Sequence, residues 1–192
     1  MASDNYGDNF MWLPGSSDIA GETTDKLFSQ RDAFEVLSFN FNMTCTESTD
    51  GNGGVGSNAG KAKFNIVTIE KYVDSASTSL YKGCSQGAIY PTVMMGIRRS
   101  GGDPLLYLQY IFRYNQVTGI SWSGGSGGER VKETLTLSFK AMGMQYIQQK
   151  ADGKPLPGKS WLWNTVNQGT ASLEIPGLPP PPRFLPGNDF AR

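Results

Sequence analysis

The sequence predicts a mainly β fold with one helix. Glycine contributes 24 of the 192 residues, and the β-branched and aromatic residues fall in short runs separated by turn-forming residues. Most of these runs alternate apolar with polar side chains, which is the period of a strand with one buried face. Residues 75–86 differ, because Ala76, Leu80 and Cys84 recur at helical spacing between a possible cap at Asp74 or Ser75 and a stop at Gly87.

Eight segments are expected to be strands. They cover residues 10–14, 33–43, 62–73, 88–99, 105–115, 116–122, 131–140 and 141–149. The apolar phase of the third shifts between Ile66 and Val67, which indicates a bulge or burial on both faces. Residues 105–115 are apolar on both phases and are expected to be buried on both sides. Residues 150–164 are expected to form a turn and a short aromatic segment.

Two strands carry a row of small polar side chains on one face. In residues 33–43, Leu37, Phe39 and Phe41 alternate with the polar row, and in residues 131–140 the apolar row includes Leu135 and Leu137. Such a polar row is expected to meet water, either outside the molecule or in an open channel. The candidate residues of the two rows are Ser38, Asn40, Asn42, Thr134, Thr136 and Ser138.

Two loops are rich in glycine. Residues 46–61 form an unusually long polar loop, a type that is usually functional or disordered. A second loop carries Gly124, Gly125, Gly127 and Gly128, although a hairpin needs only one or two glycines. Either this loop turns sharply while lying against a bulky neighbour, or it is a flexible tip.

The chain length fits one domain with terminal extensions. We predict a flexible N-terminal extension at residues 1–9, a single domain at residues 10–167, and a proline-rich C-terminal tail at residues 168–192. The tail is expected to be a flexible or surface-docked extension rather than a recognition peptide.

Composition excludes several function classes. Seventeen basic residues balance seventeen acidic ones, so neither nucleic acid nor an anionic membrane is an expected partner. The chain has no histidine, and Cys45 and Cys84 cannot form a four-thiolate site; the pair is either a disulfide or two buried thiols. The carboxylates show no catalytic spacing, and the glycines before Lys61 lack the phosphate-loop pattern. We therefore expect no enzyme activity, no metal and no cofactor.

The sequence also bears on where the protein acts. Its first ten residues, MASDNYGDNF, do not have the apolar core of a signal peptide, and no run of about 18 apolar residues occurs. We expect folding in the cytosol, no membrane insertion and, if the protein leaves the cell, export by a route that does not read a Sec-type signal.

Seven short segments, in order, resemble the hemolysin-coregulated proteins, the tube family of bacterial type VI secretion systems. Each is weak alone, but the ordered set is specific and spans about residues 10–167. The segments are GETTDK (21–26), EVLSF (35–39), the loop ending GK (60–61), KYVDSASTSLYKGCSQG (71–87), RRSGGD (98–103), GGSGGE (124–129) and QQKADG (148–153).

This resemblance implies a fold of two antiparallel sheets closed into a β-barrel-like body with one flanking α-helix. It implies hexameric rings that stack into a hollow tube, which delivers effectors and acts as a carrier or chaperone for cargo in its lumen. The implied partners are a contractile sheath, a spike protein and effector cargo, and the tube is secreted after assembly in the cytoplasm. The polar rows then become candidate lumen surface, and the four glycines of residues 124–128 a subunit-contact loop. The loop at 46–61 becomes a ring-stacking loop, with candidate residues Asp50, Gly51, Gly53, Gly54, Gly56, Gly60 and Lys61.

The sequence departs from the family pattern in three places. It carries extra residues before the first strand, the proline-rich tail, and a bulky Trp122 where small polar residues are common in the family. The tail supports an alternative function, in which the same barrel is a secreted binding module or specialised effector that uses its terminal extensions to engage a partner.

Overall fold

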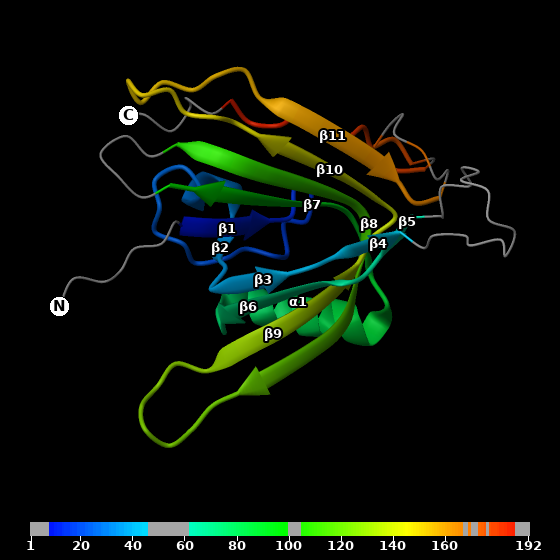
Figure 1. Cartoon of the computed structure of the whole chain (residues 1–192). Coiled ribbons are helices and arrows are strands. Elements are labelled where there is room, and N and C mark those ends of the chain that lie inside the picture. The colour runs from blue at the N-terminus through cyan, green and yellow to red at the C-terminus, as the bar shows by residue number, and fades with distance from the viewer. Residues whose placement is uncertain are drawn as a thin grey trace, which may run out of the picture.

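The computed structural model confirms a mainly β chain with antiparallel strands and a flanking α-helix (Figure 1). It describes residues 8–45, 62–99, 105–166, 169, 173–175 and 177–186. The elements in chain order are β1 (Asp8–Trp12), the 3-10 helix η1 (Ser29–Arg31), β2 (Phe34–Glu35), β3 (Ser38–Asn40), β4 (Met43–Cys45), β5 (Ala62–Phe64), β6 (Val67–Tyr72), α1 (Ser75–Gln86), β7 (Ile89–Arg98), β8 (Leu106–Ser123), β9 (Lys132–Ser138), β10 (Ala141–Tyr146) and β11 (Lys159–Asn164).

Strand β8 is the centre of the large sheet. The order is β2-β1-β7-β8-β9-β6-β3, and β10 and β11 continue from the first half of β8. The two strands expected at 105–115 and 116–122 are therefore one 18-residue strand. Its first half pairs with β7 and β10, and its second half pairs with β9.

The sheet turns where β8 passes from β10 to β9. Tyr114 has a positive φ of 55°, a conformation that is uncommon for a side chain of this size. Lys140, which lies between β9 and β10, contacts this corner. Its N–H donates to the Arg113 carbonyl at 2.9 Å, and its ammonium lies 3.6 Å from the centre of the Tyr114 ring. This bend sets the two halves of the sheet around a shared core (Figure 1).

Residues 34–40 connect the two ends of the sheet order. The Val36 N–H donates to the Asn9 carbonyl in β1, and the Leu37 N–H donates to the Glu70 carbonyl in β6. The single strand expected at 33–43 is wrong for this reason: the chain changes partners at Val36 and forms three short strands, β2, β3 and β4. Leu37 is 41% exposed rather than buried. The strand order is an open path from β2 to β3, so the closed barrel stays a prediction.

Other expected elements are confirmed or divided. The expected strand at 62–73 is two strands, because the phase shift marks the break between β5 and β6 at residues 65–66. β7, β9 and β10 lie within the expected ranges, and the expected aromatic segment is strand β11. β1 begins at Asp8, within the residues expected to be an extension.

The main hydrophobic core lies between the two halves of the sheet and under α1. Val67 and Ile69 of β6, Leu135 and Leu137 of β9, and Phe112 of β8 are almost completely buried in it. Burying side chains of this size stabilises the fold by about 1.5–3 kcal/mol each. A second cluster occupies the opposite face of the first half of the sheet and includes Phe10, Phe28, Leu106 and Ile111.

The helix has the bounds and caps that the sequence predicts. Asp74 and Ser77 form a capping box, and Gly87 ends the helix with a left-handed φ of 64°. Ala76 and Leu80 face the core, and the Tyr90 hydroxyl lies where a Cβ on Gly83 would be, so Gly83 lets β7 approach closely. Burial raises the pKa of Tyr90.

A buried ion cluster joins the start of this helix to the sheet. Lys71 of β6 and Glu133 of β9 are both fully buried, and their Nζ and Oε1 atoms lie 3.4 Å apart. The Lys71 ammonium also lies 2.6 Å from Asp74 Oδ1 and 3.0 Å from Ser77 Oγ, while Glu133 Oε2 accepts from the Trp122 indole at 2.6 Å. A buried charge is tolerated only when it is paired, so each group depends on the others.

We predict that Lys71→Met lowers the free energy of unfolding by about 3–5 kcal/mol, because Glu133 loses its buried counter-charge. Urea denaturation at pH 7 measures this change. The double variant Lys71→Met/Glu133→Leu should recover part of the loss, since no lone charge then stays buried. Lys82→Met, on the exposed face of α1, is the control and should change stability by less than about 0.5 kcal/mol. Equal effects of Lys71→Met and the control would contradict the importance of the pair.

Candidate functional surface

The two predicted polar rows lie on one face of the second half of the sheet. Strand β6 stands between them: Ser38 is opposite Glu70, and Glu70 is opposite Thr134. Directly opposed residues of neighbouring strands point to the same side. The sheet therefore brings segments almost a hundred residues apart into one surface. We call it the polar face, and it includes Ser38, Asn40, Thr68, Glu70, Thr118, Ser121, Lys132, Thr134, Thr136 and Ser138, with Tyr72 and Gln116 on the same side opposite Lys132 and Ser138.

The opposite side of the same strands is the core. Val67, Ile69 and Lys71 alternate with the polar positions of β6, and Glu133, Leu135 and Leu137 alternate with those of β9. A register slip of one residue would exchange the two sides, so the buried row determines which side is polar.

Hydroxyl groups of the polar face bond to each other and to the backbone. The Oγ1 atoms of Thr118 and Thr136 lie 3.0 Å apart, and Thr118 Oγ1 also donates to the Thr136 carbonyl at 3.2 Å. Ser38 Oγ donates to Glu70 Oε2 at 3.2 Å. A Cβ on Gly119, beside the bulge of β8, would lie 2.7 Å from Thr136 Oγ1, so a larger residue there would have to displace the Thr136 side chain. The result is a surface of short, uncharged polar groups, with Glu70 and Lys132 as its two charged members among the residues just named.

Sequence reasoning missed the contribution of β6. The expected strand at 62–73, which contains Thr68 and Glu70, has an ambiguous phase, and the pattern of residues 116–122 does not single out Thr118 or Ser121. The alternation in Val67–Tyr72, with burial at every second residue, is the signal that could have placed Thr68 and Glu70 on a polar face.

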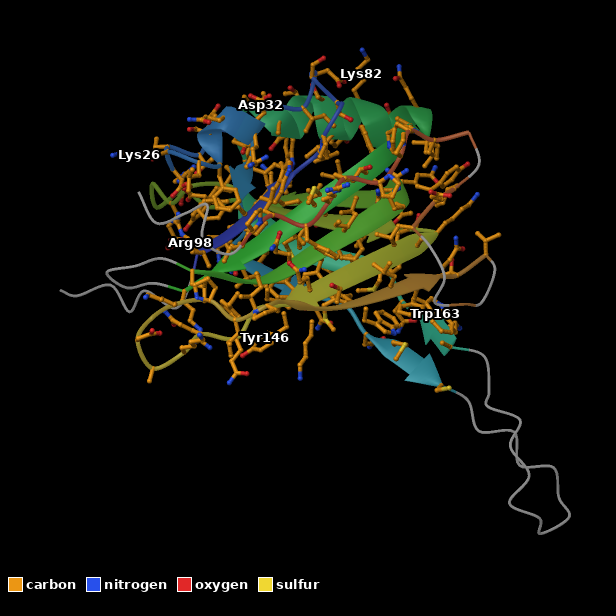
Figure 2. The ribbon with its side chains drawn as sticks, turned by 90° about the horizontal axis from the view of Figure 1, so that it is seen from above. Lys26, Asp32, Lys82, Arg98, Tyr146 and Trp163 are labelled. Atoms are coloured by element: carbon orange, nitrogen blue, oxygen red, sulfur yellow. The ribbon has the colours of Figure 1, made fainter. Side chains whose placement is uncertain are left out.

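The other five predicted lumen residues lie in β3 or β9, but Asn42 lies beyond the end of β3. Its carbonyl accepts from the Asn65 N–H at 3.0 Å, and its side-chain oxygen accepts from the Asn65 amide. This pair stands at the base of the β4–β5 ribbon, which projects from the body near Trp163 (Figure 2). Phe64 holds the ribbon by packing 6.2 Å, centre to centre, from Trp161 and from Trp163.

The candidate ring-stacking residues lie between β4 and β5, outside the described residues. They are Asp50, Gly51, Gly53, Gly54, Gly56, Gly60 and Lys61. Cys45, at the end of β4, is exposed and Cys84 is half-buried, so the interpretation of both as core thiols is wrong for Cys45.

The four candidate glycines of the subunit-contact loop are all exposed at the end of the β8–β9 hairpin, which extends away from the body (Figure 1). Only one of them has a backbone that requires glycine: Gly128, with a φ of 79°. A Cβ on Gly125 or Gly127 would meet nothing within 4 Å inside this chain. Contacts within one subunit therefore do not explain why these two positions lack a side chain, and contact with a neighbouring subunit stays a prediction.

Within the described ranges, no group of three or more His, Cys, Asp or Glu side chains is arranged to hold a metal ion. The described helices are all too short or too polar to cross a membrane.

The fold is mainly β, with antiparallel strands and one flanking helix, as the sequence resemblance implies, and comparison with known proteins decides the family. The sequence model of a family described as "Type VI secretion system effector, Hcp" matches residues 10–146. The chain belongs to the Hcp family. This is a family of structural tube proteins of type VI secretion systems, not an enzyme family.

Individual relatives agree with this assignment. The chain is 36% identical to protein hcp1 of Pseudomonas aeruginosa over 107 residues, which is 54% of this chain and 65% of that protein. It is similar to a solved type six secretion system protein, with a TM-score of 0.77, 26% identity and coverage of 86% of this chain and 99% of the other. Hcp1 from Salmonella typhimurium has a TM-score of 0.68 at the same identity and coverage.

The polar face predicts a sharp difference in accessibility between adjacent residues of β9. In a background of Cys45→Ser and Cys84→Ala, Thr134→Cys should react with a small maleimide at least about a hundredfold faster than Leu135→Cys, because Leu135 is reached only by local unfolding. Labelling rates followed by intact mass in dilute protein measure the difference. Similar rates at the two positions would contradict the assignment of the two sides of β9.

Proposed function

We propose that this Hcp-family chain is the structural subunit of a type VI secretion inner tube. Six copies form a ring, rings stack into a hollow tube, and the polar face lines the bore through which effector cargo travels. In this proposal the tube assembles in the cytoplasm inside a contractile sheath, carries a spike protein at its tip, and is secreted with its cargo.

The polar face is the observation that supports a lumen role most directly. A surface that guides varied cargo must attract none of it strongly. Short hydroxyl and amide side chains present no large apolar patch, and several of their hydrogen bonds are already made within the face. The buried Leu135 row keeps these groups on one side of the sheet, so a ring that turns this side inward has a uniformly polar wall.

Unpaired sheet edges support assembly. Within the part of the chain that the structure describes, β11 pairs along its length only with β10, and β2 pairs only with β1. Exposed strand edges favour pairing with another chain, and a heterologous contact whose rotation closes makes a ring. In the proposed ring, such edges are completed by neighbouring copies.

The alternative of a binding module with free terminal extensions has less support. It requires the tail to be available to a partner, whereas the described parts of the tail contact the chain's own sheet. We therefore retain the tube subunit as the proposed function.

Imaging of the purified protein tests the proposal. Negative-stain microscopy at increasing protein concentration should show six-fold rings and then stacked tubes. Thr134→Cys should then react with a small maleimide but not with a maleimide carried on a polymer wider than the bore seen in the same images. A protein that stays monomeric at high concentration, or polymer labelling that assembly does not change, would overturn the lumen assignment.

The 46–61 loop gives a separate expectation. We predict that Gly54→Glu blocks ring stacking but leaves single rings intact, because a charged side chain is placed in the segment proposed to reach the next ring. Tube length in micrographs and the size of single rings measure the two effects. Ala151→Glu places the same charge in another exposed loop and serves as the control. Tubes of normal length from Gly54→Glu would remove the stacking role of this loop.

A further inference from the structure

Two fully buried polar side chains stand on the face of β8 that points away from the main core. Gln109 and Arg113 are both 0% exposed, and Ile111 of the second hydrophobic cluster lies between them on the same face. Burial lowers the pKa of Arg113, and no carboxylate pairs with it in the described chain. Placing a guanidinium there is costly unless other acceptors satisfy it.

The proline-rich tail supplies those acceptors. Arg113 Nε donates to the Leu173 carbonyl at 3.3 Å, and Nη2 donates to the Pro179 carbonyl. The remaining nitrogen, Nη1, donates to Thr92 Oγ1 in the neighbouring strand β7. One side chain of the sheet thus holds two points of the tail, and its charge is satisfied by tail carbonyls.

Gln109 binds a third point of the tail, Leu185. Its Nε2 donates to the Leu185 carbonyl at 2.7 Å, and its Oε1 accepts from the Leu185 N–H at 2.9 Å. This two-bond pairing reproduces with an amide side chain the hydrogen bonds that a neighbouring strand would make.

Apolar contacts accompany these bonds. Leu173 is 5% exposed, and Phe184 and Leu185 pack on the same cluster as Ile111. Gly143 of β10 makes room for them: a Cβ there would lie 3.0 Å from Leu173 Cδ1 and 3.1 Å from Phe184 Cζ. Because Gly143 has no side chain, Leu173 and Phe184 of the tail can pack directly over the backbone of β10.

The chemistry of proline explains why side chains of the sheet, rather than its backbone, bind the tail. Residues 179–182 are four consecutive prolines, which have carbonyl acceptors but no N–H donors. Such a segment cannot add to a sheet as a regular strand, so its recognition depends on donors from the other side. Arg113 offers only donors and meets Pro179; Gln109 offers a donor and an acceptor and meets Leu185, which has both groups.

We propose that this outer sheet face is a peptide-binding site for an extended proline-rich segment, and that its occupant is the chain's own strap, described at residues 173–175 and 177–186. Arg113, Gln109 and Gly143 are its recognition residues. The strap covers the second hydrophobic cluster, and a cleft of about 470 Å³ is bordered by Ile111 and Leu162 of the sheet and by Phe184 of the strap.

Cutting the connection to the strap tests this proposal in the full, folded chain. A recognition sequence for a site-specific protease is inserted between Thr170 and Ala171, a fluorophore is attached at the C-terminus, and the protein is cleaved after folding. We expect the cut strap to co-elute with the body in gel filtration at micromolar concentration. Dilution, with unlabelled peptide 173–186 as competitor, then gives its dissociation constant.

Substitutions within the strap identify the contacts without disturbing the body. Leu185→Pro removes the N–H that donates to Gln109, and Phe184→Ala removes apolar contact; each should weaken retention by about tenfold or more. Arg183→Ala, at an exposed position between the docked residues, should change it by less than about twofold. Gln109→Ala should also weaken retention, and its effect should be less than additive with that of Leu185→Pro, since both remove the bond from the Leu185 N–H to Gln109 Oε1.

Two results would overturn the proposal: a native strap that separates from the body as soon as it is cut, or equal retention of the Phe184 and Arg183 variants. The assay measures whether a small labelled peptide stays bound to a much larger body, so its result does not depend on whether the body is a monomer or a ring. Its failure would leave the tube proposal standing, and failure of ring formation would leave the peptide site standing.

Discussion

The bend of β8 is the constraint on which the rest of the structure depends. One strand belongs to both halves of the sheet, so its turn at Tyr114 sets the angle between them and encloses the main core. Lys140, in the connection between β9 and β10, contacts this corner through its N–H and its ammonium. β10 pairs with the first half of β8 and β9 with the second half, so the same bend separates the direction of β9, which carries the polar face, from that of β10.

Two buried cations, Lys71 and Arg113, are stabilised in different ways in this protein. Lys71 is paired with Glu133 and Asp74 in a cluster that locks α1 to the sheet, whereas Arg113 is satisfied by carbonyls of the strap. The first cluster stabilises the side of the sheet opposite the polar face. Arg113, in contrast, holds the strap, which forms no regular secondary structure, against the outer side of β8. Together they explain why both charges are tolerated away from water.

Much of the local structure follows from short-range patterns. The helix, its Asp74 cap and its Gly87 stop were predicted because they depend on residues within four positions of each other. The single strand expected at 33–43 was wrong, because the change of partner at Val36 depends on Asn9 and Glu70, which are distant in the sequence. The two polar rows were predicted separately, but Glu70, which joins them, was missed because its strand had an ambiguous phase.

The sequence by itself determined the family, the mainly β class, the helix and the side of each strand that carries small polar residues, since these depend on residue identity and on periods of two or four residues. Only the tertiary structure decided that Ser38 and Thr134 share one surface, that β8 is continuous, and that the tail docks on Gln109 and Arg113. These depend on register and on which distant segments meet, and many pairings of the same alternating strands satisfy the same local pattern.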